Sequence, residues 1–251
     1  LINTGFDEPV PLIQASVKSL GFKMADIKII LASHAHADHV AGHARAREAS
    51  GAKVYVMNGD DKVIANGGKG QYLYTDSRWR PCPVDKVLKD GDKVTLGSTT
   101  LVARHTPGHT AGCITFVLDT EKMAFTGDCL LIRGCGRTDF QGGDAGRMYQ
   151  SIHTQIFTLP DDCLLYPGHD YRGLTTTSVA EEKAFNPRLG GQLSQSDFIG
   201  YMDNLGLDHP KKMDIAVPAN LKCGRPDQGD IPDDEPDWAN LTCTFAGIWE
   251  V

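Results

Sequence analysis

The run Ser33-His34-Ala35-His36-Ala37-Asp38-His39 places four side chains that can bind a metal within six residues. It follows a short apolar stretch with β-branched side chains, which predicts a buried strand. Because side chains alternate between the two faces of a strand, we expect His34 and His36 to point to the same side just beyond its end. Asp38 and His39 begin the next predicted helix and can turn towards a neighbouring point. The run therefore predicts ligands for one metal ion or for two.

Three further candidate ligands come later, each beside a glycine and next to a predicted strand. They are His109 in Thr106-Pro107-Gly108-His109-Thr110, Asp128 in Thr126-Gly127-Asp128 and His169 in Tyr166-Pro167-Gly168-His169-Asp170. Glycine lets a neighbouring backbone approach closely, and ligands at strand ends on one rim of a sheet can converge. Each alone is equally well a turn residue, but together with the early run they favour a metal site. His43, one turn after His39, is expected at the surface.

Hydrophobic periodicity and capping residues predict the order of helices and strands. The predicted strands cover residues 27–32, 53–57, 99–103, 113–118, 123–126 and 164–166. The predicted helices cover residues 9–20, 40–50 and 194–205, and a further helix opens at the capping box of Ser178 and Glu181. This order fits an αβ/βα sandwich better than a single doubly wound sheet. The long irregular stretch 66–83 contains three aromatic residues and is expected to be an ordered flap over the site.

The bulk composition is that of a globular protein: 251 residues, 41% hydrophobic and 23% charged. The net charge of -7 argues against a nucleic-acid partner. No stretch approaches the roughly 18–20 consecutive apolar residues that cross a bilayer, so we expect no membrane association. Seven scattered cysteines without a Cys-x-x-Cys pair predict free thiols.

Seven side chains match, in order, the complete metal signature of the metallo-β-lactamase superfamily: His34, His36, Asp38, His39, His109, Asp128 and His169. The resemblance implies an αβ/βα sandwich in one domain over residues 1–251, and it implies that the first strands of that fold precede Leu1 and are missing here. The superfamily includes β-lactamases, glyoxalase II-type thioesterases and persulfide dioxygenases.

The two halves of the chain resemble different members of this superfamily. Residues 1–112 resemble a subclass B3 metallo-β-lactamase, as in Leu1-Ile2-Asn3-Thr4-Gly5 and Gly70-Gln71-Tyr72-Leu73. Residues 113–251 resemble a persulfide dioxygenase, as in Thr126-Gly127-Asp128-Cys129 and Asn186-Pro187-Arg188-Leu189. The chain is therefore interpreted as a natural or constructed chimera, or as an uncommon homologue.

Asp128 favours the second resemblance, because B3 lactamases generally lack a metal-binding aspartate at that position. The likeness to persulfide dioxygenases implies one Fe(II) held by His34, His109 and Asp128, a triad of two histidines and one carboxylate. The other four ligands would then support the site or form an unused second one. The implied reaction oxidises glutathione persulfide with O2 to sulfite and glutathione. Asp38 and His39 are the candidate catalytic residues.

The same resemblance places three side chains in the substrate pocket: Arg137, Tyr171 and Arg188. An arginine can pair with a carboxylate of a glutathione adduct through two hydrogen bonds. The expected partners are this small substrate and O2, with a homodimer as a candidate assembly. No leader sequence is visible, so the expected location is the cytoplasm, or the periplasm if the protein is a lactamase.

A dinuclear zinc hydrolase is the alternative, either a B3-type β-lactamase or a glyoxalase II-like thioesterase. In that case His34, His36 and His109 would hold one Zn(II). The second Zn(II) would be held by Asp38, His39 and His169, with Asp128 between the two ions. Zinc lowers the pKa of bound water and so supplies hydroxide for attack on a β-lactam or thioester. Every ligand for this alternative is present in the sequence.

Overall fold

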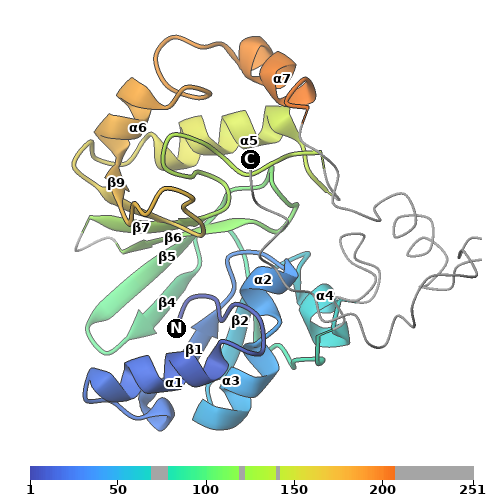
Figure 1. Ribbon diagram of the computed structural model, residues 1–251, viewed down its shortest axis with the longest axis vertical. Coiled ribbons are helices and arrows are strands. Elements are labelled where there is room, and N and C mark those ends of the chain that lie inside the picture. The colour runs from blue at the N-terminus through green and yellow to red at the C-terminus, as the bar shows by residue number, and fades with distance from the viewer. Residues whose placement is uncertain (69–78, 119–121, 140–141, 207–251) are drawn as a thin grey trace, which may run out of the picture.

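Two β-sheets face each other, and helices cover their outer sides (Figure 1). The computed structural model describes residues 1–68, 79–118, 122–139 and 142–206. Helices α1 to α4 lie on the smaller sheet, and α5 to α7 lie on the larger one. These four layers confirm the predicted αβ/βα sandwich.

The smaller sheet consists of three parallel strands in the order β1-β2-β3. The strands are β1 (Ile29–Leu31), β2 (Lys53–Met57) and β3 (Lys86–Leu88). Ile2 pairs with Leu31 in parallel, so the first residues of the chain run along the edge of this sheet beside β1. Strand β1 at this edge leads directly into the histidine run.

The larger sheet follows chain order from β4 to β9 and is antiparallel except where β7 and β8 run side by side in parallel. Its strands are β4 (Lys93–Leu96), β5 (Thr99–His105), β6 (Ile114–Leu118), β7 (Met123–Gly127), β8 (Leu164–Pro167) and β9 (Thr177–Ser178). Because β6 is antiparallel to both neighbours, β5, β7 and β8 all point the same way, and their carboxyl ends meet at one edge.

The helices are α1 (Val10–Ser19), α2 (Ala37–Val40), α3 (His43–Ser50), α4 (Asp61–Asn66), α5 (Ala145–Ser151), α6 (Val179–Phe185) and α7 (Gln195–Asp203). A 3₁₀ turn covers Met24–Asp26, and a π-helix over Ile152–Ile156 continues α5. The helix predicted over 40–50 is two helices, because α2 ends at Val40 and α3 starts at His43. Helices α4 and α5 and strands β3, β4 and β9 were not predicted.

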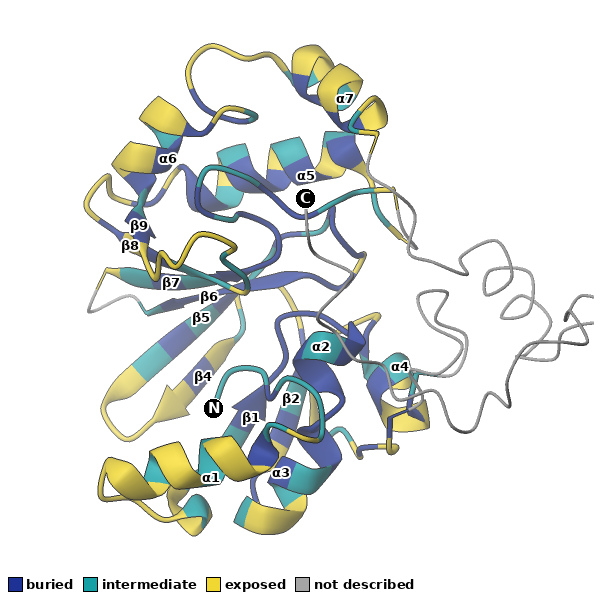
Figure 2. Cartoon of the chain, in the orientation of Figure 1, coloured by how far each residue is buried: buried dark blue, intermediate teal, exposed yellow. Residues whose placement is uncertain are grey.

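Apolar side chains fill three layers of core, one between the sheets and one under each set of helices (Figure 2). Alternation along the strands produces this division. Phe116 of β6 points into the space between the sheets, whereas its neighbour Val117 packs on the side of α5. In β2, Val54 and Val56 pack towards the helices of the smaller sheet.

The flap predicted over 66–83 lies largely outside the described residues and stays a prediction. The cysteines in the described part of the chain are free, as predicted. None of the described helices is both long and apolar enough to cross a membrane.

A buried polar network anchors the loop that joins β7 to α5. Glu182 on α6 is fully buried and accepts hydrogen bonds from the backbone N–H and guanidinium of Arg133. The hydroxyl of Thr177 (2.8 Å) and the amide of Asn186 (2.8 Å) also donate to this carboxylate. The loop held in this way continues to Arg137, whose carbonyl accepts a hydrogen bond from His109.

We predict that Glu182→Ala lowers the free energy of unfolding by about 3 kcal/mol, because it removes the buried acceptor shared by Thr177, Asn186 and the partly buried guanidinium of Arg133. Urea denaturation monitored by circular dichroism measures the change. Glu181→Ala is the matched control: this neighbouring carboxylate also pairs with Arg133 but is half exposed, so its loss should cost less than about 1 kcal/mol. Equal losses for the two variants would contradict the role assigned to the network.

Candidate metal centre

The histidine run leaves β1 and turns into α2, and this turn brings its four ligands to one point. His34 and His36 lie in the loop between the two elements, and His36 directly precedes the first helical residue. Asp38 and His39 are carried by α2 itself. The run thus presents ligands from an extended segment and from a helix to the same region, as the sequence predicted.

The three later ligands come from the larger sheet, at the edge where β5, β7 and β8 end. His109 follows β5, Asp128 follows β7 and His169 follows β8. Since this edge faces the histidine run, all seven predicted ligands lie in one cluster. The cluster joins the two sheets across their shared end.

His34, His36 and His109 form a first group of buried ligands. The Nδ1 atom of His36 lies 3.0 Å from Nε2 of His34 and 3.0 Å from Nε2 of His109. Burial, helped by the neighbouring histidines, lowers the pKa of all three rings, to about 3 for His36. At neutral pH these imidazoles are therefore uncharged and present lone pairs to a shared point, which is the state in which histidine binds a metal.

Asp38, His39 and His169 form a second group, in which charges are paired instead. Nε2 of His169 lies 3.1 Å from Oδ2 of Asp38 and 3.0 Å from Nε2 of His39. Burial opposes a charge on His169, but the hydrogen bond to Asp38 and the negative charges of Asp128 and Asp38 together outweigh burial and raise the pKa of the ring to about 9. Burial likewise opposes ionisation of Asp38, yet the hydrogen bond to His169 and the charges of His39 and His169 together lower its pKa to about 2.

Asp128 lies between the two groups. Its carboxylate oxygens are 3.6 Å from Nε2 of His109, 3.5 Å from Nε2 of His39 and 3.4 Å from Nε2 of His169. Burial favours the protonated acid, but the surrounding histidines hold the pKa of Asp128 well below its usual range. Oδ1 is buried and has no hydrogen-bond partner among the described residues.

These residues fit a bound metal cation. Nδ1 of His36 lies close to a ring nitrogen of both His34 and His109, and Asp128 adds a buried oxygen, Oδ1, without a hydrogen-bond partner among the described residues. Imidazole and carboxylate together suit zinc, iron or manganese. The first group and the second group have the composition of two adjacent metal sites. Each pair within the predicted iron triad, His34, His109 and Asp128, is also close together.

Gly168 lets the backbone pass directly beside Asp128, as the glycines next to the ligands suggested. A Cβ atom on Gly168 would lie 2.3 Å from Oδ1 of Asp128 and 3.0 Å from Cε1 of His39. Both distances are too short for non-bonded atoms, so a side chain there must push these ligands away.

Gly168→Ala is therefore expected to lower metal retention by about tenfold or more while the fold persists. Metal content after dialysis, measured by inductively coupled plasma mass spectrometry, checks this. Gly200→Ala on α7 is the control, because a Cβ there meets nothing within 4 Å. Full metal content in Gly168→Ala would show that the cluster tolerates displacement of Asp128.

Metal binding by the second group should release a proton at neutral pH. The pKa of His169 is raised to about 9, so its ring carries a proton that a metal must displace. Below that pKa the proton competes with the metal, so apparent affinity should rise roughly tenfold per pH unit and level off above about pH 9. Calorimetric titration in buffers of different ionisation enthalpy counts the proton. Binding without proton release would contradict the charge pairing.

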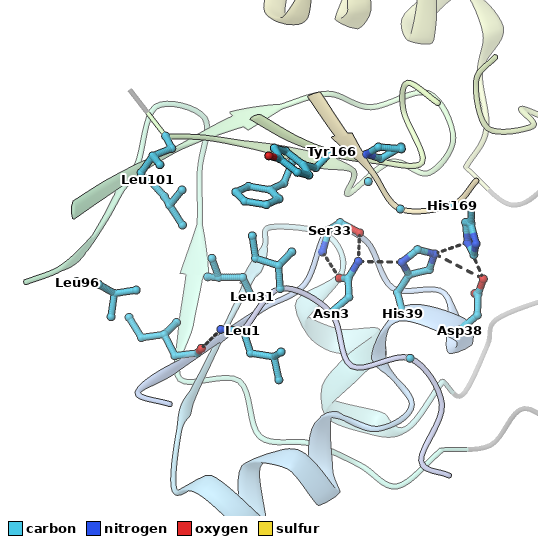
Figure 3. Close-up of a pocket in the computed structure, with 18 of the residues that line it drawn as sticks. Leu1, Asn3, Leu31, Ser33, Asp38, His39, Leu96, Leu101, Tyr166 and His169 are labelled. Atoms are coloured by element: carbon cyan, nitrogen blue, oxygen red, sulfur yellow. Dashed lines mark hydrogen bonds and ion pairs between the residues drawn. The ribbon is translucent and has the colours of Figure 1, made fainter. Parts of the chain in front are cut away.

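A cavity of about 740 Å³ between the sheets reaches the second group (Figure 3). Leu31 and Phe125 belong to its apolar wall, and Asp38, His39 and His169 line its polar end. Ligands of the second group are thus accessible from an apolar space.

None of the three predicted substrate residues lines this cavity, although Arg137 and Tyr171 each contact a candidate ligand. The carbonyl of Arg137 accepts a hydrogen bond from Nδ1 of His109 (2.7 Å), and its guanidinium pairs with Asp139. The exposed ring of Tyr171 stacks on His169, with ring centroids 6.1 Å apart. Arg188 lies over the ring of Tyr201. Substrate contact by Arg137, Tyr171 and Arg188 stays a prediction.

The sequence did not reveal the residues that orient the ligands. Ser33 Oγ lies 3.1 Å from Nδ1 of His34, and Asn3 Nδ2 lies 2.9 Å from Nδ1 of His39. The surface position predicted for His43 is wrong: the ring is fully buried, and its Nδ1 lies 2.8 Å from Thr4 Oγ1.

The fold and the ligand set are those of the metallo-beta-lactamase superfamily, and the chain belongs to it: the family model matches residues 1–169. Persulfide dioxygenase ETHE1, mitochondrial, of Mus musculus is 46% identical over 208 residues, covering 83% of this chain and 72% of the mouse protein. The Homo sapiens protein of the same name is 44% identical over 217 residues, covering 86% and 76%.

Solved structures show the same two likenesses that the sequence suggested. The crystal structure of ETHE1 from Myxococcus xanthus has a TM-score of 0.68 at 40% identity and covers 89% of this chain and 88% of that one. The BLEG-1 B3 metallo-beta-lactamase has a TM-score of 0.67 at 28% identity, covering 76% and 88%. The mouse match spans 83% of this chain, so the likeness to persulfide dioxygenases extends well before residue 113.

Proposed function

We propose that this protein is an iron-dependent dioxygenase that oxidises glutathione persulfide to sulfite and glutathione. The observation that carries the proposal is Asp128, a buried carboxylate within 3.6 Å of His109 and grouped with His34. Relatives 44–46% identical to this chain are named persulfide dioxygenase, and they supply the substrate class.

His34, His109 and Asp128 are the proposed iron ligands. Iron(II) held by two histidines and one carboxylate supplies O2 chemistry and leaves positions for substrate. In the balanced reaction one persulfide, one O2 and one water give glutathione, hydrogen sulfite and a proton. The terminal sulfur of the persulfide is oxidised, its bond to the glutathione sulfur breaks, and O2 is reduced.

In this proposal, residues beside the metal site select the glutathione part of the substrate. The backbone carbonyl of Arg137 orients His109, and its guanidinium lies on the same loop, ready to exchange Asp139 for a carboxylate of glutathione. Tyr171, stacked on His169, presents an exposed aromatic face beside the second group. Both residues contact a candidate ligand, Arg137 through its backbone carbonyl and Tyr171 through its ring, which supports their assignment to the substrate.

The alternative is a dinuclear zinc hydrolase acting on a β-lactam or a thioester. One observation favours it: the ligand atoms form two complete groups of three, His34 with His36 and His109, and Asp38 with His39 and His169. Two zinc ions at these groups would supply a hydroxide nucleophile. The number and kind of bound metal ions separates the two functions.

The proposed function is tested with protein loaded with Fe(II) and supplied with glutathione persulfide, with O2 uptake and sulfite as readouts. We expect one O2 to be consumed per sulfite formed. We also expect Arg137→Ala to lower kcat/KM by about tenfold or more, because the substrate carboxylate loses its guanidinium partner. Arg45→Ala, which breaks a half-exposed ion pair with Asp7 elsewhere, should leave the rate unchanged. The parallel assay is hydrolysis of a chromogenic β-lactam by Zn(II)-loaded protein. Rapid hydrolysis there without O2 uptake in the iron form would establish the alternative.

A further inference from the structure

Asp60 follows β2 at the same edge of the smaller sheet where the histidine run follows β1. The two strands are parallel, so their carboxyl ends lie side by side. Asp60 directly precedes α4, a position at which an aspartate side chain usually accepts a hydrogen bond from its own helix. Here the side chain makes no such bond. Instead, its Oδ2 accepts from the backbone N–H of Ala35 at 2.8 Å, between the candidate ligands His34 and His36.

This hydrogen bond fixes the middle of the histidine run. Asp60 and Ala35 are both buried, and Ala35 lies beyond the last paired residue of β1. A buried backbone N–H needs an acceptor, because leaving it without one is unfavourable. The carboxylate of Asp60 supplies that acceptor where the strand no longer does. It thereby holds the peptide from which His34 and His36 extend on either side.

The same carboxylate packs against the loop of the larger sheet that carries His109. A Cβ atom on Gly112 would lie 2.2 Å from Cγ and 2.2 Å from Oδ1 of Asp60, closer than non-bonded atoms approach. Glycine at this position therefore lets the loop close onto Asp60. Nearby, the N–H of Ile114 donates to the carbonyl of Ser33 at 2.9 Å and joins the same two segments. Asp60 thus lies between the two segments that supply the first group.

We propose that Asp60 is a positioning residue that holds the histidine run and the His109 loop at their working separation, through Ala35 on one side and Gly112 on the other. It acts through these two backbone segments and not as a ligand. The inference rests on the metal site of the proposed function, but not on its reaction. Burial raises the pKa of Asp60 to about 7, so its uncharged form is populated near neutral pH. The position therefore needs an acceptor for Ala35 more than it needs a negative charge.

The test measures how fast Zn(II) leaves the folded protein when a chromophoric chelator is in excess. Asp60→Ala removes the acceptor, and we expect release to become about tenfold faster or more. Asp60→Asn keeps a carbonyl oxygen of the same reach, so release should stay within about twofold of the wild type. The absorption spectrum of Co(II)-loaded protein reports ligand geometry and should change only in Asp60→Ala. Asp61→Asn is the control, because this neighbouring carboxylate accepts from the exposed N–H of Gly59 and should change neither readout.

Gly112→Ala tests the same contact from the other segment. Its Cβ should displace the carboxylate and speed release by a similar factor, yet add less than about twofold in the Asp60→Ala background. Circular dichroism verifies folding, and if Asp60→Ala does not fold, release from folded Gly112→Ala decides the test.

Three outcomes would overturn the inference. They are wild-type release in Gly112→Ala, independent effects of the two substitutions in the double variant, and release from Asp60→Asn as fast as from Asp60→Ala. Because these readouts involve no turnover, an absent dioxygenase activity would reject the proposed function alone.

Discussion

Four strand ends from two sheets meet at one buried point, and the ligand cluster depends on that meeting. The histidine run leaves β1 of the smaller sheet, whereas His109, Asp128 and His169 follow three co-directional strands of the larger one. No single sheet carries a complete group of ligands, because each group of three mixes residues from both. The two sheets must therefore pack against each other before any of these groups can bind a metal ion.

The charges within the cluster divide it into two sites of different character. The buried rings of His34, His36 and His109 have lowered pKa values and offer lone pairs. In the second group the protonated ring of His169 is paired with the carboxylate of Asp38, so the negative charge of Asp38 is already balanced without a metal ion. A cation entering the first group meets no competing proton, while one entering the second must expel one. The two groups therefore differ in protonation, because the histidines of the first group are uncharged whereas His169 in the second group is paired with Asp38.

The likeness to two kinds of superfamily member has a structural basis in this arrangement. Lactamases and dioxygenases share the sandwich and its ligand positions, so a fold comparison alone gives TM-scores of 0.67 and 0.68 to one of each. The sequence resemblance leads us to expect that the difference between them lies in individual side chains such as Asp128 and in the loop that carries Arg137. The chemistry of a superfamily fold is decided at such sites rather than by the sheets.

The sequence by itself determined the seven candidate ligands, their order and the α/β layers, because these depend on local spacing and on the alternation of apolar residues. It missed β3, β4 and α5, whose short or weakly patterned segments are stabilised by pairing and packing far along the chain. Only the tertiary structure decided which ligands share a group, that His43 is buried, and that Asn3 faces His39. Those facts depend on contacts between residues more than 30 positions apart, as between Asn3 and His39, which no local pattern encodes.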